Sequence, residues 1–308
     1  MAPRLFLVGP TAGGKTAVAL EIARRMPVEI ISLDSMSVYR GMDVGTAKPT
    51  LAERRGVVHH GLDLVDPDEE FSVSDFVAHV DGVLDSLAAR DGVAILAGGT
   101  GFWLRAVARG LAIEELPHDP AVRASLEAEL GASGPEALAE RLSALAPGLA
   151  ATTDLRNPRR VVRALEIATL RGDGPRPAPR GYAGPVAWVL IDMADHTRHR
   201  EWIAARSERQ LDGGILMEAA ALRERFGEDL RAFSSIGYRE AWDLLDGKIA
   251  REGYLATNTQ RNVDFARRQR TWFRRERFDL ALDVMALPSA GDVLARVRPR
   301  LFPDVAAG

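Results

Sequence analysis

Short apolar runs alternate with helix-forming segments in the first third of the chain. Residues 5–8, 28–34 and 93–97 are compact apolar runs of the kind found in buried strands, and a polar or glycine-rich turn follows each of them. Residues 17–25 and 74–90 lie between these runs and are rich in strong helix formers. Strands that alternate with helices indicate a parallel sheet covered by helices.

The pattern changes between residues 117 and 182. Helical periodicity follows helical periodicity without a strand between them, and a stretch rich in proline and glycine, 172–179, closes the segment like a linker. Strand character returns at residues 186–191, which end at Asp192, and the rest of the chain is predicted to be helical. The helices expected between 117 and 182 cover residues 119–130, 135–145 and 158–170.

Composition places the chain among ordinary globular proteins. The 308 residues are 46% hydrophobic and 27% charged, with a net charge of −3. There is no cysteine, which excludes disulfides and thiol catalysis. No apolar run approaches membrane-spanning length and no signal-peptide pattern is present, so we expect a cytoplasmic protein with no membrane partner.

A phosphate-binding loop lies between the first predicted strand and the first predicted helix. Its sequence fits G-x-x-x-x-G-K-[ST], in which backbone N–H groups and the helix dipole converge on a polyphosphate. Lys15 would bring a positive charge to the terminal phosphate, and the Thr16 hydroxyl would be a ligand for Mg²⁺. The alternative is a glycine-rich turn that binds nothing. The residues of the loop are Gly9, Pro10, Thr11, Ala12, Gly13, Gly14, Lys15 and Thr16.

Two further turns are expected at the same edge of the sheet. Asp34 ends the second predicted strand and begins a long polar loop that extends to Pro49. The third predicted strand ends in a glycine turn with Thr100, which could lie beside the phosphate-binding loop or be a plain connection. A hydrolytic NTPase needs a strand ending in an acid beside a simple turn, so it is disfavoured, whereas a small-molecule kinase stays possible.

Arginine clusters point to a polyanionic partner. Arg159, Arg160 and Arg163 open the helix predicted at 158–170, where they could close over a pyrophosphate or form an ordinary charged face. A second helix near the C-terminus is denser in arginine, and a patch of this kind favours nucleic acid over a merely solvated surface. Its arginines are Arg261, Arg267, Arg268, Arg270, Arg274, Arg275 and Arg277. The adjacent pair His59-His60 cannot share one face and does not predict a transition-metal site.

Several blocks of the chain together resemble the tRNA dimethylallyltransferase family. The most specific of them runs from Asp34 to Pro49 (DSMSVYRGMDVGTAKP), where Ser37 replaces a glutamine that is frequent in the family. The others are the phosphate-binding loop, Gly98-Gly99-Thr100, the block 159–166, Ile236-Gly237-Tyr238-Arg239 and RRQRTWFR at 267–274. The resemblance extends from the first strand to about residue 277.

The resemblance implies a fold and an activity. The fold would be α/β, a P-loop parallel-sheet core with an inserted all-helical domain and a helical C-terminal part. Its expected divisions are 1–116, 117–182 and 183–308. The enzyme would transfer a dimethylallyl group from dimethylallyl diphosphate to N6 of the adenosine 3′-adjacent to the anticodon of tRNA, with Mg²⁺ as cofactor. The loop 9–16 would then hold a leaving diphosphate, Asp34 would take the amine proton, and Thr100 would hold the amine or a phosphate oxygen.

The resemblance also implies the site residues and partners. Arg163 would assist at the diphosphate, and the tRNA anticodon stem-loop would be held by the insertion and the C-terminal helix of a monomer. The residues expected at the tRNA are Asp34, Ser35, Met36, Ser37, Thr100, Arg123, Arg159, Arg160, Arg163, Gly237, Tyr238, Arg239, Arg267, Arg268, Arg270 and Arg274. Two alternatives stay open: a P-loop kinase that uses ATP on a small metabolite, and a non-catalytic RNA-binding protein with a vestigial P-loop.

Overall fold

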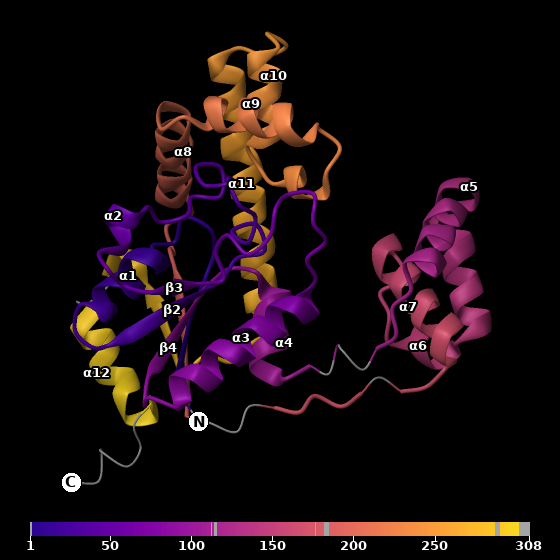
Figure 1. Ribbon diagram of the computed structural model, residues 1–308, viewed down its shortest axis with the longest axis horizontal. Coiled ribbons are helices and arrows are strands. Elements are labelled where there is room, and N and C mark those ends of the chain that lie inside the picture. The colour runs from indigo at the N-terminus through magenta and orange to yellow at the C-terminus, as the bar shows by residue number, and fades with distance from the viewer. Residues whose placement is uncertain are drawn as a thin grey trace. The chain divides into compact units, whose positions relative to one another are not determined.

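The chain folds into two compact units, which Figure 1 shows in a computed structural model. The first unit combines residues 1–107 with 182–308, and the second spans residues 108–181. The insertion was predicted at 117–182, so the second unit begins earlier along the chain than expected. The structure describes residues 2–111, 113, 116–175, 177–181, 185–286 and 290–301.

A six-stranded sheet forms the centre of the first unit. The strands lie in the order β3-β2-β4-β1-β5-β6, and every pair of neighbours is parallel, as predicted. The two edge strands were not predicted, because a pair of histidines and a run of four residues carry too little apolar periodicity. The strands are β1 (Arg4–Val8), β2 (Val28–Leu33), β3 (His59–His60), β4 (Val93–Gly98), β5 (Val186–Asp192) and β6 (Leu280–Asp283).

The helices of the first unit come from the segments before and after the second unit. Ser72 begins α3 with a capping box, because its hydroxyl accepts from the Asp75 N–H while the Asp75 carboxylate accepts from the Ser72 N–H. The α-helices of the first unit are α1 (Lys15–Ala23), α2 (Leu51–Arg54), α3 (Val73–Ala88), α4 (Gly101–Arg109), α8 (His196–Asp212), α9 (Ile215–Phe226), α10 (Tyr238–Leu245), α11 (Arg251–Phe273) and α12 (Ala290–Leu301). Two short 3-10 turns, Arg231–Ser234 and Val284–Ala286, complete it.

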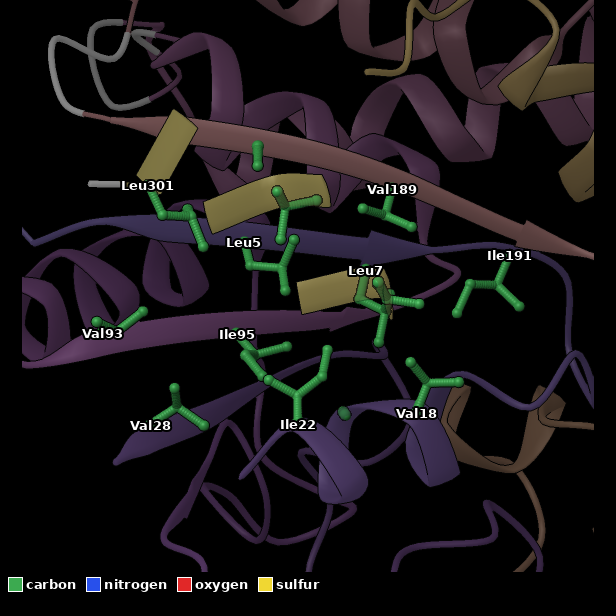
Figure 2. Packing of buried hydrophobic residues seen from close by; sticks show 14 of the residues in the cluster. Leu5, Leu7, Val18, Ile22, Val28, Val93, Ile95, Val189, Ile191 and Leu301 are labelled. Atoms are coloured by element: carbon green, nitrogen blue, oxygen red, sulfur yellow. The ribbon is translucent and has the colours of Figure 1, made fainter. Parts of the chain in front are cut away.

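An apolar layer fixes the sheet against α1 and α12. Leu5, Leu7 and Ile95 project from the central strands toward Ile22 of α1, and Leu301 of α12 joins the same cluster (Figure 2). Burying one such side chain stabilises the fold by about 1.5–3 kcal/mol. This packing holds the carboxyl ends of β1, β2 and β4 together at one edge, which is where ligands bind in parallel α/β sheets.

All the regular secondary structure described in the second unit is helical. It contains α5 (Pro120–Leu145), α6 (Pro147–Ala151) and α7 (Pro158–Arg171), packed around a cluster of small and branched apolar side chains. Two helices had been predicted where α5 lies, and the left-handed φ of 82° at Gly134, before Pro135, marks the kink between them. This arrangement agrees with the predicted fold class of a parallel-sheet core with a helical insertion. Among the described residues of the whole chain, no helix is long and apolar enough to span a membrane.

Candidate active site at the carboxyl edge of the sheet

The loop between β1 and α1 passes close to the end of β5. A Cβ atom on Gly9 would lie 1.9 Å from the Ile191 carbonyl oxygen, so only glycine fits there. Gly14 has a left-handed φ of 80° and forms the N-cap of α1, which begins at Lys15. The loop therefore has the tight turn and the exposed helix N-terminus that anion binding requires.

Two cations meet at this loop. Lys15 Nζ donates to the Pro10 carbonyl at 2.6 Å, and burial, followed by the neighbouring Arg206, lowers the pKa of Lys15 to about 8. Asp34 and Asp192 act in the opposite direction and favour the charged ammonium. Arg206 comes from α8, and its Nη1 donates to Thr11 Oγ1 at 2.9 Å. Burial also lowers the pKa of Arg206, which nonetheless stays charged at neutral pH.

Arg206 was not among the residues predicted at the site. Its segment was predicted only to be helical, and nothing in the local pattern distinguishes Arg206 from Arg209 three residues later. Its approach to Thr11 depends on packing between segments almost two hundred residues apart, which local sequence does not encode.

A cavity of about 990 Å³ opens over the phosphate-binding loop. Residues 11–16 form one wall, and Asp34 and Ser37 after β2 form another. Such a volume is in the range of small-molecule binding sites. The remaining walls include Asp43, Val44, Thr46, Ala47, Lys48, Pro49, Gly98, Gly99, Arg206, Arg209, Gln210, Phe265 and Gln269.

Asp34 lies at the predicted place, directly after β2. Its Oδ1 accepts from the Met36 N–H at 2.9 Å, which fixes the carboxylate without neutralising it. Thr100 is close behind it: its Oγ1 accepts from the Ser35 N–H at 3.2 Å, and its own N–H donates to the Leu33 carbonyl at 3.2 Å. The structure thus brings Asp34, Ser35 and Thr100 together.

The loop after Asp34 is held by side chains from distant helices. Glu218 of α9 accepts from three consecutive backbone N–H groups, those of Asp43 (3.0 Å), Val44 (2.7 Å) and Gly45 (3.0 Å). Gln210 of α8 donates to the Val44 and Gly45 carbonyls at 2.8 and 3.0 Å. The wall of the cavity that this loop forms therefore depends on contacts with α8 and α9.

Lys48, which belongs to the same loop, holds it together through its buried ammonium group. Its side chain is only 2% exposed, and Nζ donates to the Tyr39 carbonyl at 2.6 Å and to the carboxylates of Asp43 (2.8 Å) and Asp63 (2.5 Å). Lys48 stands beside the cavity, but its ammonium is already fully engaged.

Helix α11 reaches the phosphate-binding loop through Gln269. Its Oε1 accepts from the Thr11 N–H at 2.8 Å, and its Nε2 donates to the Gly99 carbonyl at 3.0 Å. The buried amide thereby joins the loop after β1 to the glycine turn after β4. Gln269 was not predicted to be a site residue, because a single glutamine in a helix carries no signal of its own.

Arg270 differs from the arginines grouped with it. Its Nε donates to both Asp192 oxygens at 2.9 and 3.0 Å, and its side chain is only 12% exposed. The expectation that it lines an exposed basic face with Arg267 and Arg274 is therefore wrong, because the carboxylate at the end of β5 draws it inward. Arg267, Arg268 and Arg274 are exposed as expected.

The turn before α10 needs a similar correction. Tyr238 is fully buried, its hydroxyl donates to Glu218 Oε1 at 2.7 Å, and its ring closes over Gly45. Burial, together with the charge of Glu218, raises the pKa of the Tyr238 hydroxyl. Gly237 is buried as well, and only Arg239 of this turn is exposed. Tyr238 and Gly237 therefore shape the loop and do not present a surface to RNA.

In the second unit, two predicted site arginines surround one buried carboxylate. Glu166 accepts from Arg123 at 2.5 Å, from Arg163 at 2.6 Å and from His118 at 2.6 Å. Burial alone would raise the pKa of Glu166, but these hydrogen bonds and the Asp119 N–H lower it to about 2. Arg163 Nη1 also donates to the Pro117 carbonyl at 2.7 Å.

This network gives the two arginines a structural role, and the diphosphate and tRNA contacts expected of them stay predictions. Arg163 and Arg123 are used to hold the second unit together, because a buried carboxylate needs charged donors around it. Arg159 and Arg160 lie on the exposed side of α7, where Arg160 makes one ion pair of 3.6 Å with Asp154. They are the two predicted arginines of this unit whose positions suit an external anion.

The residues present suit a divalent ion that arrives with a phosphate ligand. Thr16 exposes its hydroxyl in the first turn of α1, and the Asp34 carboxylate lines the same cavity. Mg²⁺ is commonly held by one or two protein oxygens together with substrate phosphates and water. Among the described residues there is no cluster of three or more histidine or carboxylate side chains that would hold a metal unaided.

Comparisons with known proteins converge on one family. The sequence model of the family described as IPP transferase matches residues 37–276, and that of isopentenyl transferase matches residues 4–64. The tRNA dimethylallyltransferase of Alkalilimnicola ehrlichii is 44% identical over 89% of this chain and 88% of its own. The corresponding protein of an Azoarcus species is 39% identical with the same coverage.

Solved structures give the same picture. The full-length tRNA isopentenylpyrophosphate transferase of Bacillus halodurans superposes with a TM-score of 0.69 at 33% identity, covering 97% of this chain and 98% of that one. A eukaryotic dimethylallyltransferase has a TM-score of 0.81 at 20% identity, covering 97% of this chain and 79% of that one, and shares the fold.

Proposed function

The chain belongs to the IPP transferase family, and we propose that it is a tRNA dimethylallyltransferase. It transfers a dimethylallyl group from dimethylallyl diphosphate to N6 of the adenosine adjacent, on the 3′ side, to the anticodon. The observation that carries this proposal is the cavity lined by both Asp34 and Lys15, in which the Asp34 carboxylate favours the charged form of Lys15. Such a site holds a diphosphate and a proton acceptor together, as the transfer requires.

The donor side of the reaction depends on positive charge. When the allylic C–O bond breaks, its electron pair stays on the diphosphate, so negative charge grows on the bridging oxygen. Lys15, Arg206 and the N–H groups at the start of α1 lie where they stabilise that charge. Stabilisation that increases as the bond breaks accelerates the step itself, and does not merely tighten binding.

The acceptor side depends on Asp34. The amine of adenine is a poor nucleophile because its lone pair is delocalised into the ring. As N6 bonds to the allylic carbon it must lose a proton, and the Asp34 carboxylate takes it. The Met36 N–H holds Oδ1 in place, so the carboxylate is oriented before the substrate arrives. Thr100 acts behind Asp34 by fixing the Ser35 backbone.

Mg²⁺ is the proposed cofactor. Bound to the diphosphate, it would supply additional positive charge to the leaving group. Thr16 would be its protein ligand, and Asp34 lines the cavity in which it would lie. Lys15 and Arg206 contribute their charges independently of the ion.

The partner is the anticodon stem-loop of a tRNA. The predicted arginines that the structure leaves exposed are Arg267, Arg268 and Arg274 on α11 and just beyond it, Arg239 on α10, and Arg159 and Arg160 on α7. Exposed arginines of this kind contact phosphates and set affinity without selecting sequence. The target base lies in a single-stranded loop, where its extrusion costs little.

Ligand binding separates this function from that of a kinase. Thermal unfolding is measured with Mg²⁺ alone, with dimethylallyl diphosphate and Mg²⁺, and with ATP and Mg²⁺. A ligand that binds only the folded state raises the unfolding temperature, and at a fixed ligand concentration the rise is larger for the tighter ligand. We expect a clear rise with dimethylallyl diphosphate and a smaller one with ATP. The reverse order would contradict the proposed function.

A further inference from the structure

Every polar atom of Thr11 is held by a side chain from a distant helix. Its N–H donates to Gln269 Oε1 at 2.8 Å, its hydroxyl accepts from Arg206 at 2.9 Å, and its carbonyl contacts His199 Nε2 at 2.9 Å. Arg206 and His199 belong to α8, and Gln269 belongs to α11. Thr11, in the phosphate-binding loop, is therefore held by side chains from two helices that follow the insertion in sequence.

The protonation state of His199 follows from its two neighbours. On one side, Arg270 Nη2 lies 2.8 Å from His199 Nδ1. A guanidinium has donors only, so Nδ1 must be the acceptor and carries no proton. The ring proton is therefore on Nε2, where it is donated to the Thr11 carbonyl, which has no proton to give. The imidazole is a neutral Nε2–H tautomer, fixed from both ends.

The surroundings of His199 support the neutral state. The residue is 2% exposed, and burial lowers its pKa, with Arg270 and Lys15 adding to the effect. The Thr11 carbonyl and the Asp192 carboxylate act in the other direction. Asp192 is already bound to Arg270 Nε, so it orients the arginine that orients the histidine.

These three contacts matter because the backbone is strained at Ala12, the residue after Thr11. Ala12 has a left-handed φ of 54°, which costs a non-glycine residue about 1 kcal/mol or more. A backbone in that conformation persists only when its surroundings hold it, and here three side chains hold the residue immediately before it. The N–H groups that follow, up to the start of α1, are those that a diphosphate would contact.

We propose that His199 is a positioning residue for diphosphate binding: its Nε2–H, set by the Asp192–Arg270 pair, fixes the Thr11 carbonyl and thereby the shape of the phosphate-binding loop. The inference rests on the proposed function, because it takes the diphosphate to be the ligand of that loop. His199 touches neither substrate, so its effect reaches the ligand only through Thr11.

Two amide substitutions of His199 separate the two ring nitrogens. His199→Gln places an N–H donor near the position of Nε2 and retains the bond to Thr11. His199→Asn is shorter: its oxygen can accept from Arg270 in place of Nδ1, but its N–H does not reach Thr11. The affinity for inorganic pyrophosphate with Mg²⁺ is measured by calorimetry for the full-length wild type and both variants. Binding of an anticodon stem-loop RNA is measured in parallel.

The expected result is selective rescue. His199→Asn should bind pyrophosphate about 3- to 10-fold more weakly, the range expected when one hydrogen bond is removed, whereas His199→Gln stays within about two-fold of the wild type. RNA affinity should change little in either variant, which distinguishes the effect from partial unfolding. Equal affinities in all three proteins, or an equal loss in both variants, would overturn the inference. A wild type that binds neither pyrophosphate nor dimethylallyl diphosphate would instead contradict the proposed function.

Discussion

The hydroxyl of Tyr238 donates a hydrogen bond of 2.7 Å to Glu218 Oε1, and this pair is one of the contacts that hold the loop after Asp34. The same carboxylate accepts from the N–H groups of Asp43, Val44 and Gly45. A Cβ atom on Gly45 would lie 2.5 Å from the Tyr238 ring, so loop and ring are in close contact. One acidic side chain thus accepts from four donors, three of them in partly buried hydrogen bonds.

Removing the carboxylate should cost more than removing the hydroxyl. Glu218→Ala leaves three loop N–H groups and Tyr238 without their acceptor, and we expect a loss of about 1–3 kcal/mol in the free energy of unfolding. Tyr238→Phe removes a single hydrogen bond and should cost about 0.5–1.5 kcal/mol. Urea denaturation measures both changes. Glu224→Ala, an exposed residue on the same helix, is the matched control and should be near neutral. A loss in Glu218→Ala no larger than in the control would contradict the assignment.

The charge of Lys15 should set the upper pH limit of diphosphate binding. The pKa of Lys15 is lowered to about 8, and the ammonium form is the one that binds an anion. Affinity for dimethylallyl diphosphate should therefore be fully present well below pH 8 and fall as the pH rises through that value, by at most about tenfold per pH unit. The ligand does not mask this trend, because the last ionisation of such a phosphate lies near pH 6.

The matched variant for this test is Lys15→Arg. An arginine keeps its charge over the whole range, so the decline above pH 8 should disappear even if the overall affinity is lower. Calorimetric titrations between about pH 7 and pH 9 compare the two proteins. The same decline in both would show that another group is responsible.

The arginines of α11 and its C-terminal end should divide into two classes. Replacing the exposed Arg267 and Arg274 by alanine should weaken tRNA binding and reduce the slope of log affinity against log salt concentration by roughly one for each phosphate that is no longer neutralised. The control pair is Arg296→Ala with Arg298→Ala on α12, two exposed arginines outside the predicted site. A slope that falls equally in the control pair would contradict the assignment of this face.

Arg270→Ala should behave differently from the substitutions of Arg267 and Arg274. It leaves the Asp192 carboxylate and His199 without their donor, so we expect lower stability and weaker diphosphate binding with an unchanged salt slope for tRNA. Thermal unfolding and the same salt titration measure the two effects. A reduced salt slope with normal stability would indicate that Arg270 belongs to the RNA-binding face after all.

How much the sequence revealed depended on whether the signal was local. The phosphate-binding loop and Asp34 are defined by short spacings around strands, so they were predicted and lie together at one edge of the sheet. The partner of a long side chain depends on tertiary packing. Arg270 and Arg163 have the spacing of an exposed face, yet Asp192 and Glu166 draw them inward. Arg206 carried no signal that distinguished it from its neighbours.

Asp34 is the residue on which the chemistry of the acceptor depends. Asp34→Asn keeps the shape of the side chain and one oxygen that accepts from the Met36 N–H, but it cannot take a proton. Single-turnover transfer should fall by about 10²–10⁴, with tRNA affinity changed far less. Rapid-quench assays of the transfer step and a separate binding titration measure the two quantities. A transfer rate within a few-fold of the wild type would leave Asp34 as an anchor of its loop and nothing more.

The proposed reaction moves a dimethylallyl group from its diphosphate to tRNA. Its most direct test incubates the protein with Mg²⁺, dimethylallyl diphosphate and an unmodified tRNA, and follows the RNA mass and the released diphosphate together. We predict a gain of one dimethylallyl group per tRNA, located on the amine of the adenosine next to the anticodon, with one diphosphate released for each transfer. A tRNA that stays unmodified under these conditions, or phosphate transfer when ATP replaces the prenyl donor, would contradict the proposed function.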